Sequence, residues 1–469
     1  MSDLELTVRG GLVVIDGVVR RADLGAADGR IVAIAERLPA GDTDIDATGL
    51  TVLPGLVDVH VHFREPGMTA KEDFATGTDA AAAGGVTTVL DMPNTSPPVV
   101  SAAHLVAKRE VVEPKARVDF GLFGLFSEEV IEEIDGLVEA GACALKLYMG
   151  QTTGDNGCPE DDVVLLGLRR AAELGIVVGA HAENERMRRV LVAELQRQGR
   201  RDPIAHLESR PATIEGEAVA RLGRLARLAG AHVHVHHLSS AEGLGEVERA
   251  RGMGARMSCE SLVGHLLLDD SAYGRLGNVV KLNPPIRPAS DVAALWDGIA
   301  RGAIDCIATD HAPHEPEGQH EPDVWKATAG FIGVETMLPL LLTEVADGRL
   351  TLPRLVELCC TRPAALFGLG ERKGSIAVGA DADLVLVDLD RVGVVRGEAL
   401  HSRHPITPYE GRTTVGAVEM TLVRGLPVWA AGELTATRPG RMVVPRRTPS
   451  EPRGPIRRHS ATEPAGVAG

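Results

Sequence analysis

The chain has 469 residues and a formal net charge of −16, and hydrophobic residues fill 44% of its positions. This length suggests one large domain with additions, and the acidic balance argues against nucleic-acid binding, because phosphate backbones attract cationic surfaces. No apolar run approaches the roughly 18 residues of a membrane span. Six scattered cysteines without a C-x-x-C pair, and an N-terminus without a secretory signal, are typical of a cytoplasmic protein.

The two ends of the chain carry similar patterns. Residues 4–38 alternate in short runs separated by glycine and Asp-Gly turns, which predicts a small sheet. The pattern returns in residues 379–390 and 413–433. We expect these parts, residues 1–53 and 370–435, to form one small β-sandwich together.

The middle of the chain has a different sequence pattern from the two ends. Over residues 54–369, short apolar runs alternate with helical runs rich in Ala, Leu, Arg and Glu. This alternation predicts an α/β fold of parallel βα units, and the length suits a TIM-type (β/α)8 barrel. Residues 436–469 are rich in Pro, Arg, Ser and Gly, which predicts a disordered tail. A basic tail could also bind an acidic partner.

The first predicted barrel strand carries two histidines. Residues 51–63, TVLPGLVDVHVHF, alternate and are β-branched near their end, so His60 and His62 share one face of a strand. Two imidazoles at the C-terminal end of a strand could bind one divalent ion. Two polar residues on a solvated face would give the same pattern.

Three other strand-like runs end on possible metal ligands. These are IVVGAHAEN with His181, HVHVHHLSS with His237, and DCIATDHAPH with Asp310. In barrels of parallel strands, active sites collect at the C-terminal ends of the strands. Each residue alone could be capped or solvated, but four strands with the same feature predict a metal centre.

Lys146 lies in GACALKLYMG, an otherwise apolar strand. Lysine is rarely buried unless it is paired or chemically altered, and burial raises the neutral fraction of its amine. A neutral lysine can take up carbon dioxide, and the resulting carbamate could bridge two metal ions. A lysine that reaches solvent from the strand end is the structural alternative.

Five motifs together resemble the amidohydrolase superfamily, and within it the cyclic-amide hydrolases. They are PGLVDVHVHFREPG, KEDFATGTDAAAAGGVTTVLDMPNT, GAHAENE, HHLSS and ATDHAPH, within a resemblance from about residue 4 to residue 433. The pattern is most similar to dihydroorotases, which implies zinc-dependent hydrolysis of L-dihydroorotate in pyrimidine synthesis. It also implies two zinc ions bridged by carboxylated Lys146, with Asp310 as the catalytic base. The implied ligands are His60, His62, Lys146, His181, His237 and Asp310.

Arg64 follows His62 on the same face. Its cationic guanidinium group cannot bind a metal, but its paired N–H donors match the two oxygens of a carboxylate. In dihydroorotases the matching arginine holds the ring carboxylate together with an asparagine in MPNT and a histidine in APH, here Asn94 and His314. Asn283 completes the expected substrate-binding set. The structural alternatives are a salt bridge between Arg64 and Glu65 or another acid, and a turn role for Asn94.

Some segments depart from the dihydroorotase pattern. KLYMGQTTG is equally similar to allantoinases and hydantoinases, EPEGQH follows ATDHAPH where a lysine is usual, and VGHL replaces PHHL. An allantoinase or a hydantoinase/dihydropyrimidinase is therefore the alternative. A further alternative is a non-catalytic scaffold of aspartate carbamoyltransferase, although every ligand position is filled here. We also expect a small-molecule substrate, a homo-oligomer and association with aspartate carbamoyltransferase.

Overall fold

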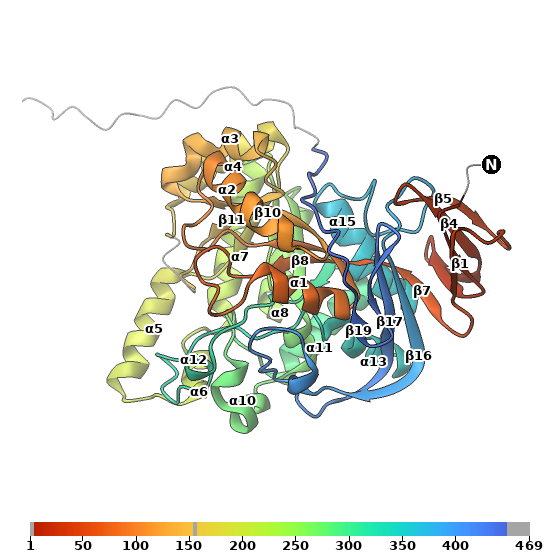
Figure 1. Ribbon diagram of the computed structural model, residues 1–469. Coiled ribbons are helices and arrows are strands. Elements are labelled where there is room, and N and C mark those ends of the chain that lie inside the picture. Colours follow the sequence, from red (N-terminus) through yellow and green to blue (C-terminus); the bar gives the residue numbers. More distant parts are fainter. Residues whose placement is uncertain (1–3, 153–156, 448–469) are drawn as a thin grey trace, which may run out of the picture.

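The computed structural model describes residues 4–152 and 157–447. Its centre is an eight-stranded sheet of parallel strands in the order β15-β14-β13-β12-β11-β10-β9-β8 (Figure 1). The two ends of this order meet, because Val61 and His311 form a parallel bridge and the amide of His62 donates to the carbonyl of His311 at 2.8 Å. The sheet therefore closes into a barrel, and the predicted fold class is confirmed. The strands are β8 (Leu56–Val61), β9 (Val86–Asp91), β10 (Asp119–Phe126), β11 (Ala144–Tyr148), β12 (Val178–His181), β13 (His232–Val235), β14 (Arg256–Leu262) and β15 (Cys306–Ala308).

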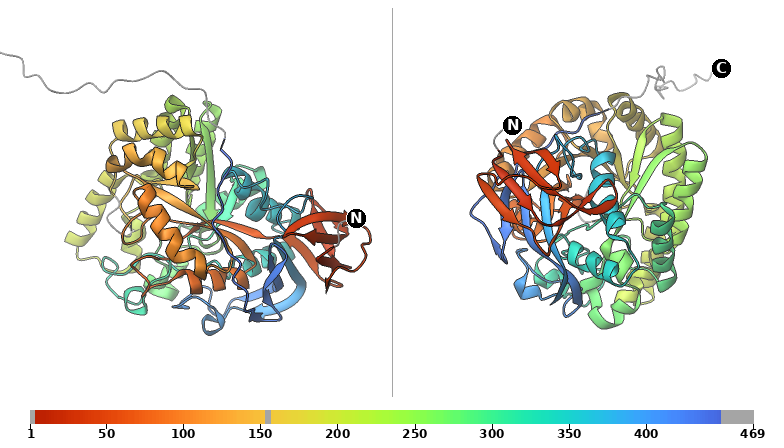
Figure 2. Two further views of the ribbon diagram at one scale, coloured as in Figure 1. Left: turned by 45° about the horizontal axis from the view of Figure 1, so that its top comes forward. Right: turned by 90° about the vertical axis from the view of Figure 1, so that its right-hand side faces the viewer.

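Helices surround the barrel and cover the outer face of its strands (Figure 2), whereas the inner face is enclosed within the barrel. All eight residues of β10 are buried, which explains why the strands read as nearly continuous apolar runs. The α-helices are α1 (Phe74–Ala83), α2 (Ala102–Val112), α3 (Ile134–Glu139), α4 (Asp161–Leu174), α5 (Glu185–Arg197), α6 (Pro203–Glu208), α7 (Ala212–Ala229), α8 (Ala241–Gly252), α9 (Val263–Leu267), α10 (Ser271–Leu276), α11 (Ala289–Arg301), α12 (Pro316–Gln319), α13 (Met337–Ala346), α14 (Leu352–Val356) and α15 (Arg362–Leu366). The 3₁₀ segments are η1 (Glu113–Lys115), η2 (Glu128–Glu133), η3 (Gly277–Val280) and η5 (Gly397–Ala399), and η4 (Glu357–Thr361) is a π-helix.

Short capped loops connect the strands that carry His181 and His237 to their helices. The side chain of Asn184 accepts from the amide of Met187 and begins α5, and Ser240 accepts from the amide of Gly243 and begins α8. These side chains satisfy amides that lack partners at a helix start. Each helix begins four residues after the histidine, and the capped loop restricts the position of that histidine.

Two further sheets pack at one side of the barrel (Figure 1, Figure 2). The order β5-β4-β1-β6 uses only the N-terminal part of the chain, whereas β19-β18-β17-β16-β7-β2-β3 combines both ends, as predicted. The residue boundaries of these parts stay predictions. The N-terminal strands are β1 (Leu6–Arg9), β2 (Leu12–Ile15), β3 (Val18–Arg21), β4 (Asp23–Ala27), β5 (Arg30–Ala35), β6 (Thr43–Asp46) and β7 (Thr51–Pro54). The C-terminal strands are β16 (Leu384–Val394), β17 (Thr413–Val423), β18 (Leu426–Ala430) and β19 (Glu433–Leu434).

The segment predicted to be a disordered tail, residues 436–469, falls into two parts. Residues 436–447 lie against the barrel, where the amide of Val443 donates to the carbonyl of Phe120 at 2.8 Å and the amide of Arg446 donates to Gly368 at 2.9 Å. Residues 448–469 lie outside the described residues. In the described ranges, no helix combines the length and apolar character needed to cross a membrane.

Candidate metal centre and active site

The structure gathers the predicted site residues at the C-terminal ends of the barrel strands. Nine of the ten line one pocket, together with Tyr148, Thr152 and Leu282. The nine are His60, His62, Arg64, Asn94, Lys146, His181, His237, Asn283 and Asp310. The tenth, His314, is not in the lining but contacts it, with its Nε2 3.2 Å from Nη2 of Arg64.

Two sets of ligand atoms converge in this pocket. In the first set, Oδ1 of Asp310 lies 3.3 Å from Nε2 of His60 and 3.1 Å from Nε2 of His62. In the second set, Nδ1 of His181 and Nε2 of His237 lie 3.0 Å apart. His237 also belongs to a group with His60 and Asp310 whose ligand atoms all lie within 4.8 Å of one another. Imidazole and carboxylate donors in such a cluster suit zinc and similar divalent ions.

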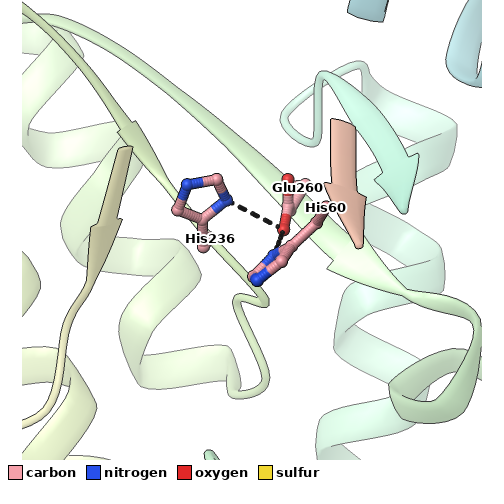
Figure 3. A group of neighbouring side chains, drawn as sticks. All are labelled: His60, His236 and Glu260. Carbon is pink, nitrogen blue, oxygen red and sulfur yellow. Dashed lines mark hydrogen bonds and ion pairs between the residues drawn. The ribbon is translucent and has the colours of Figure 1, made fainter. Parts of the chain in front are cut away.

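The orientation of His60 is fixed by Glu260 of β14, which lies inside the barrel (Figure 3). Oε1 of Glu260 accepts from Nδ1 of His60 at 2.5 Å and from Nδ1 of His236 at 3.1 Å, and Oε2 accepts from Nε2 of His234 at 3.0 Å. Burial alone would raise the pKa of Glu260, but the surrounding imidazoles hold it well below its usual range. The ionised carboxylate therefore keeps the proton of His60 on Nδ1 and leaves Nε2 free to bind a metal ion.

His62 and His181 are oriented in the same way by other residues. Oδ1 of Asn94 lies 2.8 Å from Nδ1 of His62, and Oε2 of Glu183 lies 2.9 Å from Nε2 of His181. Glu183 is fully buried and also pairs with Arg210. In each histidine, one ring nitrogen has a protein partner and the other faces the pocket. This arrangement is typical of metal-binding histidines.

Lys146 differs from the other buried lysines of the chain. Lys108 pairs with Asp91, Lys373 is surrounded by Asp119, Asp381 and Asp383, and Lys281 donates to two carbonyls. Lys146 is only 1% exposed, yet within residues 4–152 and 157–447 its ammonium forms no ion pair or hydrogen bond. Burial lowers its pKa to about 8. The structural alternative of a lysine that reaches solvent does not fit this burial.

Three residues of the pocket have a strained backbone. Arg64, His237 and Asp310 have φ angles of 62°, 40° and 47°, in the left-handed region that non-glycine residues rarely adopt. Each such residue costs of order 1–3 kcal/mol and persists only where the surrounding structure enforces it. The strain therefore coincides with two proposed ligands and the proposed substrate contact.

The salt bridge between Arg64 and Glu65, the structural alternative to substrate binding, is not formed. Glu65 accepts from the amide of Phe74 at 3.0 Å and pairs with Lys115. Arg64 donates through Nε to the carbonyl of Pro313 at 3.3 Å, and burial lowers its pKa to about 10. The guanidinium therefore stays charged and lines the pocket.

Sequence reasoning missed Glu260, Glu183 and Tyr148. Tyr148 is 2% exposed, lines the pocket and has a hydroxyl group without a hydrogen-bond partner among the described residues. The available signal is an acidic side chain inside a barrel strand, as at Glu260 in RMSCESL. A buried carboxylate requires donors, but the sequence does not reveal which residues supply them.

Comparisons with known proteins agree with this geometry. The model of the "Amidohydrolase family" matches residues 51–428. The chain is 39% identical to an allantoinase of Rubrobacter xylanophilus over 96% of this chain and 100% of that protein, and 38% identical to an allantoinase of Solibacter usitatus over 94% and 97%. It is also similar to the structure of L-hydantoinase (dihydropyrimidinase) from Arthrobacter aurescens, with a TM-score of 0.92, 33% identity, and coverage of 94% of this chain and 100% of that one.

These findings correct the expected activity. The prediction of a dihydroorotase in pyrimidine synthesis is wrong, because the full-length relatives are named allantoinases and the structural neighbour is a hydantoinase. The same names give no support to an association with aspartate carbamoyltransferase. The metal ligands that these enzymes share explain the error, since the motifs around them are specific to the superfamily and less specific to a substrate.

Proposed function

The chain belongs to the amidohydrolase family, and we propose that within it the protein is an allantoinase, which opens the hydantoin ring of allantoin by hydrolysis. Membership of this family and the names of the relatives together support the assignment of a hydrolase that acts on cyclic amides. The observation that carries the narrower proposal is identity of 38–39% to allantoinases over nearly the whole length of both chains.

We propose two zinc ions as the cofactor. The first ion would be held by His60, His62 and Asp310, and the second by His181 and His237, because these sets converge separately. Bound metal ions supply Lewis-acid activation of a carbonyl group and of water. The donor set, with imidazole and carboxylate ligands each held by an outer partner, supports this assignment.

Carboxylated Lys146 is the proposed bridge between the two ions. An unpaired ammonium in this pocket would carry a large desolvation cost. A pKa of about 8 leaves an appreciable neutral fraction near neutral pH, and only the neutral amine reacts with carbon dioxide. The anionic carbamate would place a negative charge among imidazoles and bound cations, which removes the uncompensated charge.

The side chains around this centre have separable roles. The carboxylate of Asp310 would accept a proton from the attacking water and pass it to the ring nitrogen that leaves. The hydroxyl group of Tyr148 would donate to the developing oxyanion at the ring carbonyl, because it is buried and has no described protein partner. Asn283 also lines the pocket, with its Nδ2 3.4 Å from Oγ1 of Thr152, and would orient the ring.

A second candidate is a hydantoinase or dihydropyrimidinase, which the structural similarity favours. One experiment separates the candidates: kcat/KM of the zinc-loaded protein with allantoin, hydantoin, dihydrouracil and dihydroorotate. We expect allantoin to be the preferred substrate. Preference for hydantoin or dihydrouracil would favour the second candidate, and turnover of none would overturn the enzymatic proposal.

We also propose a cytoplasmic location and a homo-oligomeric state. All six cysteines are free in the structure, which suits a reducing compartment. Light scattering on the purified chain would test the self-association.

A further inference from the structure

A second cavity lies at the opposite end of the barrel from the metal centre. It has a volume of about 330 Å³ and is lined by the N-terminal ends of neighbouring strands, including Val177 before β12, His232 of β13 and Arg256 of β14. Helix α15 and residues 445–447 complete its wall. The proposed chemistry uses none of these residues. We call this cavity the basal pocket.

The basal pocket is cationic in a chain that is strongly anionic overall. Its lining contains four arginines and neither aspartate nor glutamate, although the formal net charge of the chain is −16. The four are Arg256, Arg362, Arg446 and Arg447. Acids outside the lining neutralise two of them, since Arg362 pairs with Asp305 at 3.0 Å and Arg446 pairs with Glu371.

The other two arginines have unused donors. Arg447 donates through Nη1 to the carbonyl of Val138 at 3.1 Å and through Nη2 to Ala142 at 2.6 Å, which fixes its guanidinium plane. Its Nε is buried and has no hydrogen-bond partner within the described ranges. Arg256 forms no ion pair with any described residue, and its side chain lines the same cavity. The pocket therefore presents two uncompensated positive charges.

His232 adds a neutral polar group to this wall. Its Nε2 lies 2.9 Å from the hydroxyl group of Ser258. Burial and the nearby cations lower its pKa to about 4, so its ring is uncharged near neutral pH and can donate or accept a hydrogen bond. The wall thus combines fixed charge with a hydrogen-bonding group, as small-ligand sites usually do.

We propose that the basal pocket binds a compact small-molecule dianion, either a phosphate group or a pair of neighbouring carboxylates. Guanidinium forks match both groups through paired hydrogen bonds. The volume lies at the lower end of the range of roughly 300–1,000 Å³ found for ligand pockets, which suits a small metabolite.

Calorimetric titration of the zinc-loaded full chain with inorganic phosphate, and separately with succinate, tests the proposal. We expect one saturable site for at least one probe, and the stronger probe identifies the source of the dianion. The double variant Arg256→Gln/Arg447→Gln should weaken binding at least about 10-fold, since it removes both uncompensated charges and their hydrogen bonds to the anion. The control Arg20→Gln/Arg197→Gln removes the same charge from exposed positions elsewhere and should bind like the parent.

Arg256→Gln alone keeps the test valid if loss of Arg447 disturbs the fold, because Arg256 is exposed and forms no described ion pair. It should also weaken binding. Equal affinity in the parent and both arginine variants would overturn the proposal, as would equal weakening in the control. Binding that disappears with the zinc ions but survives the arginine changes would place the anion at the metal centre and would equally overturn it.

Discussion

Nδ1 of His60 donates a hydrogen bond of 2.5 Å to the carboxylate of Glu260, a residue 200 positions later in the chain. The same carboxylate accepts from His234, His236 and the amide of His237. One buried anion therefore sets the orientation of a proposed ligand of the first ion and of the backbone that carries a proposed ligand of the second.

Glu260→Gln should lower zinc affinity about 10- to 100-fold, the usual effect of losing an outer-shell partner. The amide has only one acceptor oxygen, and its NH₂ group would face an imidazole N–H. Competition with a fluorescent chelator would measure the affinity. Glu344→Gln is the matched control, because Glu344 is a buried carboxylate on the outer helix α13 that pairs with Arg349. An unchanged zinc affinity in Glu260→Gln would show that Glu260 does not contribute to metal binding.

Lys146→Ala should lose activity and reduce the bound metal below two ions, because the proposed bridge is gone. Short carboxylic acids such as propionate should restore part of both, since they can occupy the vacated space as anionic ligands. Metal analysis and steady-state rates in graded propionate would measure the effect. Lys108→Ala removes a buried lysine that is paired with Asp91 and should not be rescued. Retention of two ions and near-normal rates in Lys146→Ala would end the two-ion model.

The barrel and the placement at strand ends of the histidines proposed as ligands could be predicted from the sequence, because both depend on local periodicity. His60 and His62 share a face through the strand period of two, and four strands repeat the feature at the same end. Glu260 could not be assigned a role in this way. Its partners come from β8 and β13, and only closure of the barrel brings them together.

The substrate was assigned wrongly for a related reason. The sequence pattern predicts that Arg64 and Asn94 together bind a carboxylate, but Oδ1 of Asn94 lies 2.8 Å from Nδ1 of His62. An asparagine with this contact orients a proposed metal ligand and therefore does not distinguish one substrate from another. Substrate choice depends on a few side chains in loops, whereas the motifs mainly contain the proposed metal ligands and the residues that orient them.

Gly179 of β12 shows how tightly this interior is packed. A Cβ atom at this position would lie 2.0 Å from Nε2 of His236, so Gly179→Ala must displace the imidazole that also contacts Glu260. We expect a loss of about 1–3 kcal/mol in unfolding free energy, as for other overpacked cores. Urea unfolding would measure this loss. Gly245→Ala in α8 meets no atom within 4 Å and should instead stabilise the chain by about 0.5–1 kcal/mol.

Two buried histidines hold the segment that carries Asn283. Nε2 of His206 lies 2.8 Å from the carbonyl of Leu282, and Nε2 of His265 lies 3.1 Å from that of Pro284. Burial lowers the pKa of His265 from 6.5 to about 4. Between these values the unfolded chain binds a proton at this residue and the folded chain does not, so stability falls as the pH falls from 6.5 towards 4.

His265→Gln should flatten this pH dependence by up to about 1.4 kcal/mol per pH unit, the effect of one proton. Glutamine keeps a donor that can reach the carbonyl of Pro284. Urea unfolding of the metal-free protein between pH 4 and 7 would measure the slope without a contribution from metal loss. His320→Gln, at an exposed position, should leave the slope as it is. An unchanged slope in His265→Gln would show that another group causes the acid sensitivity.

Arg64 gives a test of substrate recognition that does not depend on the metal ions. Its Nε and Nη2 contact Pro313 and His314, and within the described residues Nη1 has no hydrogen-bond partner. Allantoin has no ring carboxylate, but its ureido group carries a carbonyl oxygen that Nη1 could bind. Hydantoin lacks that group. If Arg64 contacts the ureido carbonyl, its loss should therefore affect the two substrates differently.

Arg64→Met should lower kcat/KM for allantoin by about 10- to 100-fold, because a hydrogen bond from a charged donor contributes about 1.5–3 kcal/mol. The loss for hydantoin should be much smaller, and zinc content should not change because Arg64 is not a ligand. Methionine adds no new strain at a φ of 62°, since arginine is already a non-glycine residue there. Arg64→Lys should keep only part of the kcat/KM for allantoin, because lysine supplies the positive charge without the paired N–H donors of a guanidinium group. Equal losses on both substrates, together with a lower Tm, would mean that Arg64 only holds the loop of Pro313 and His314 in place.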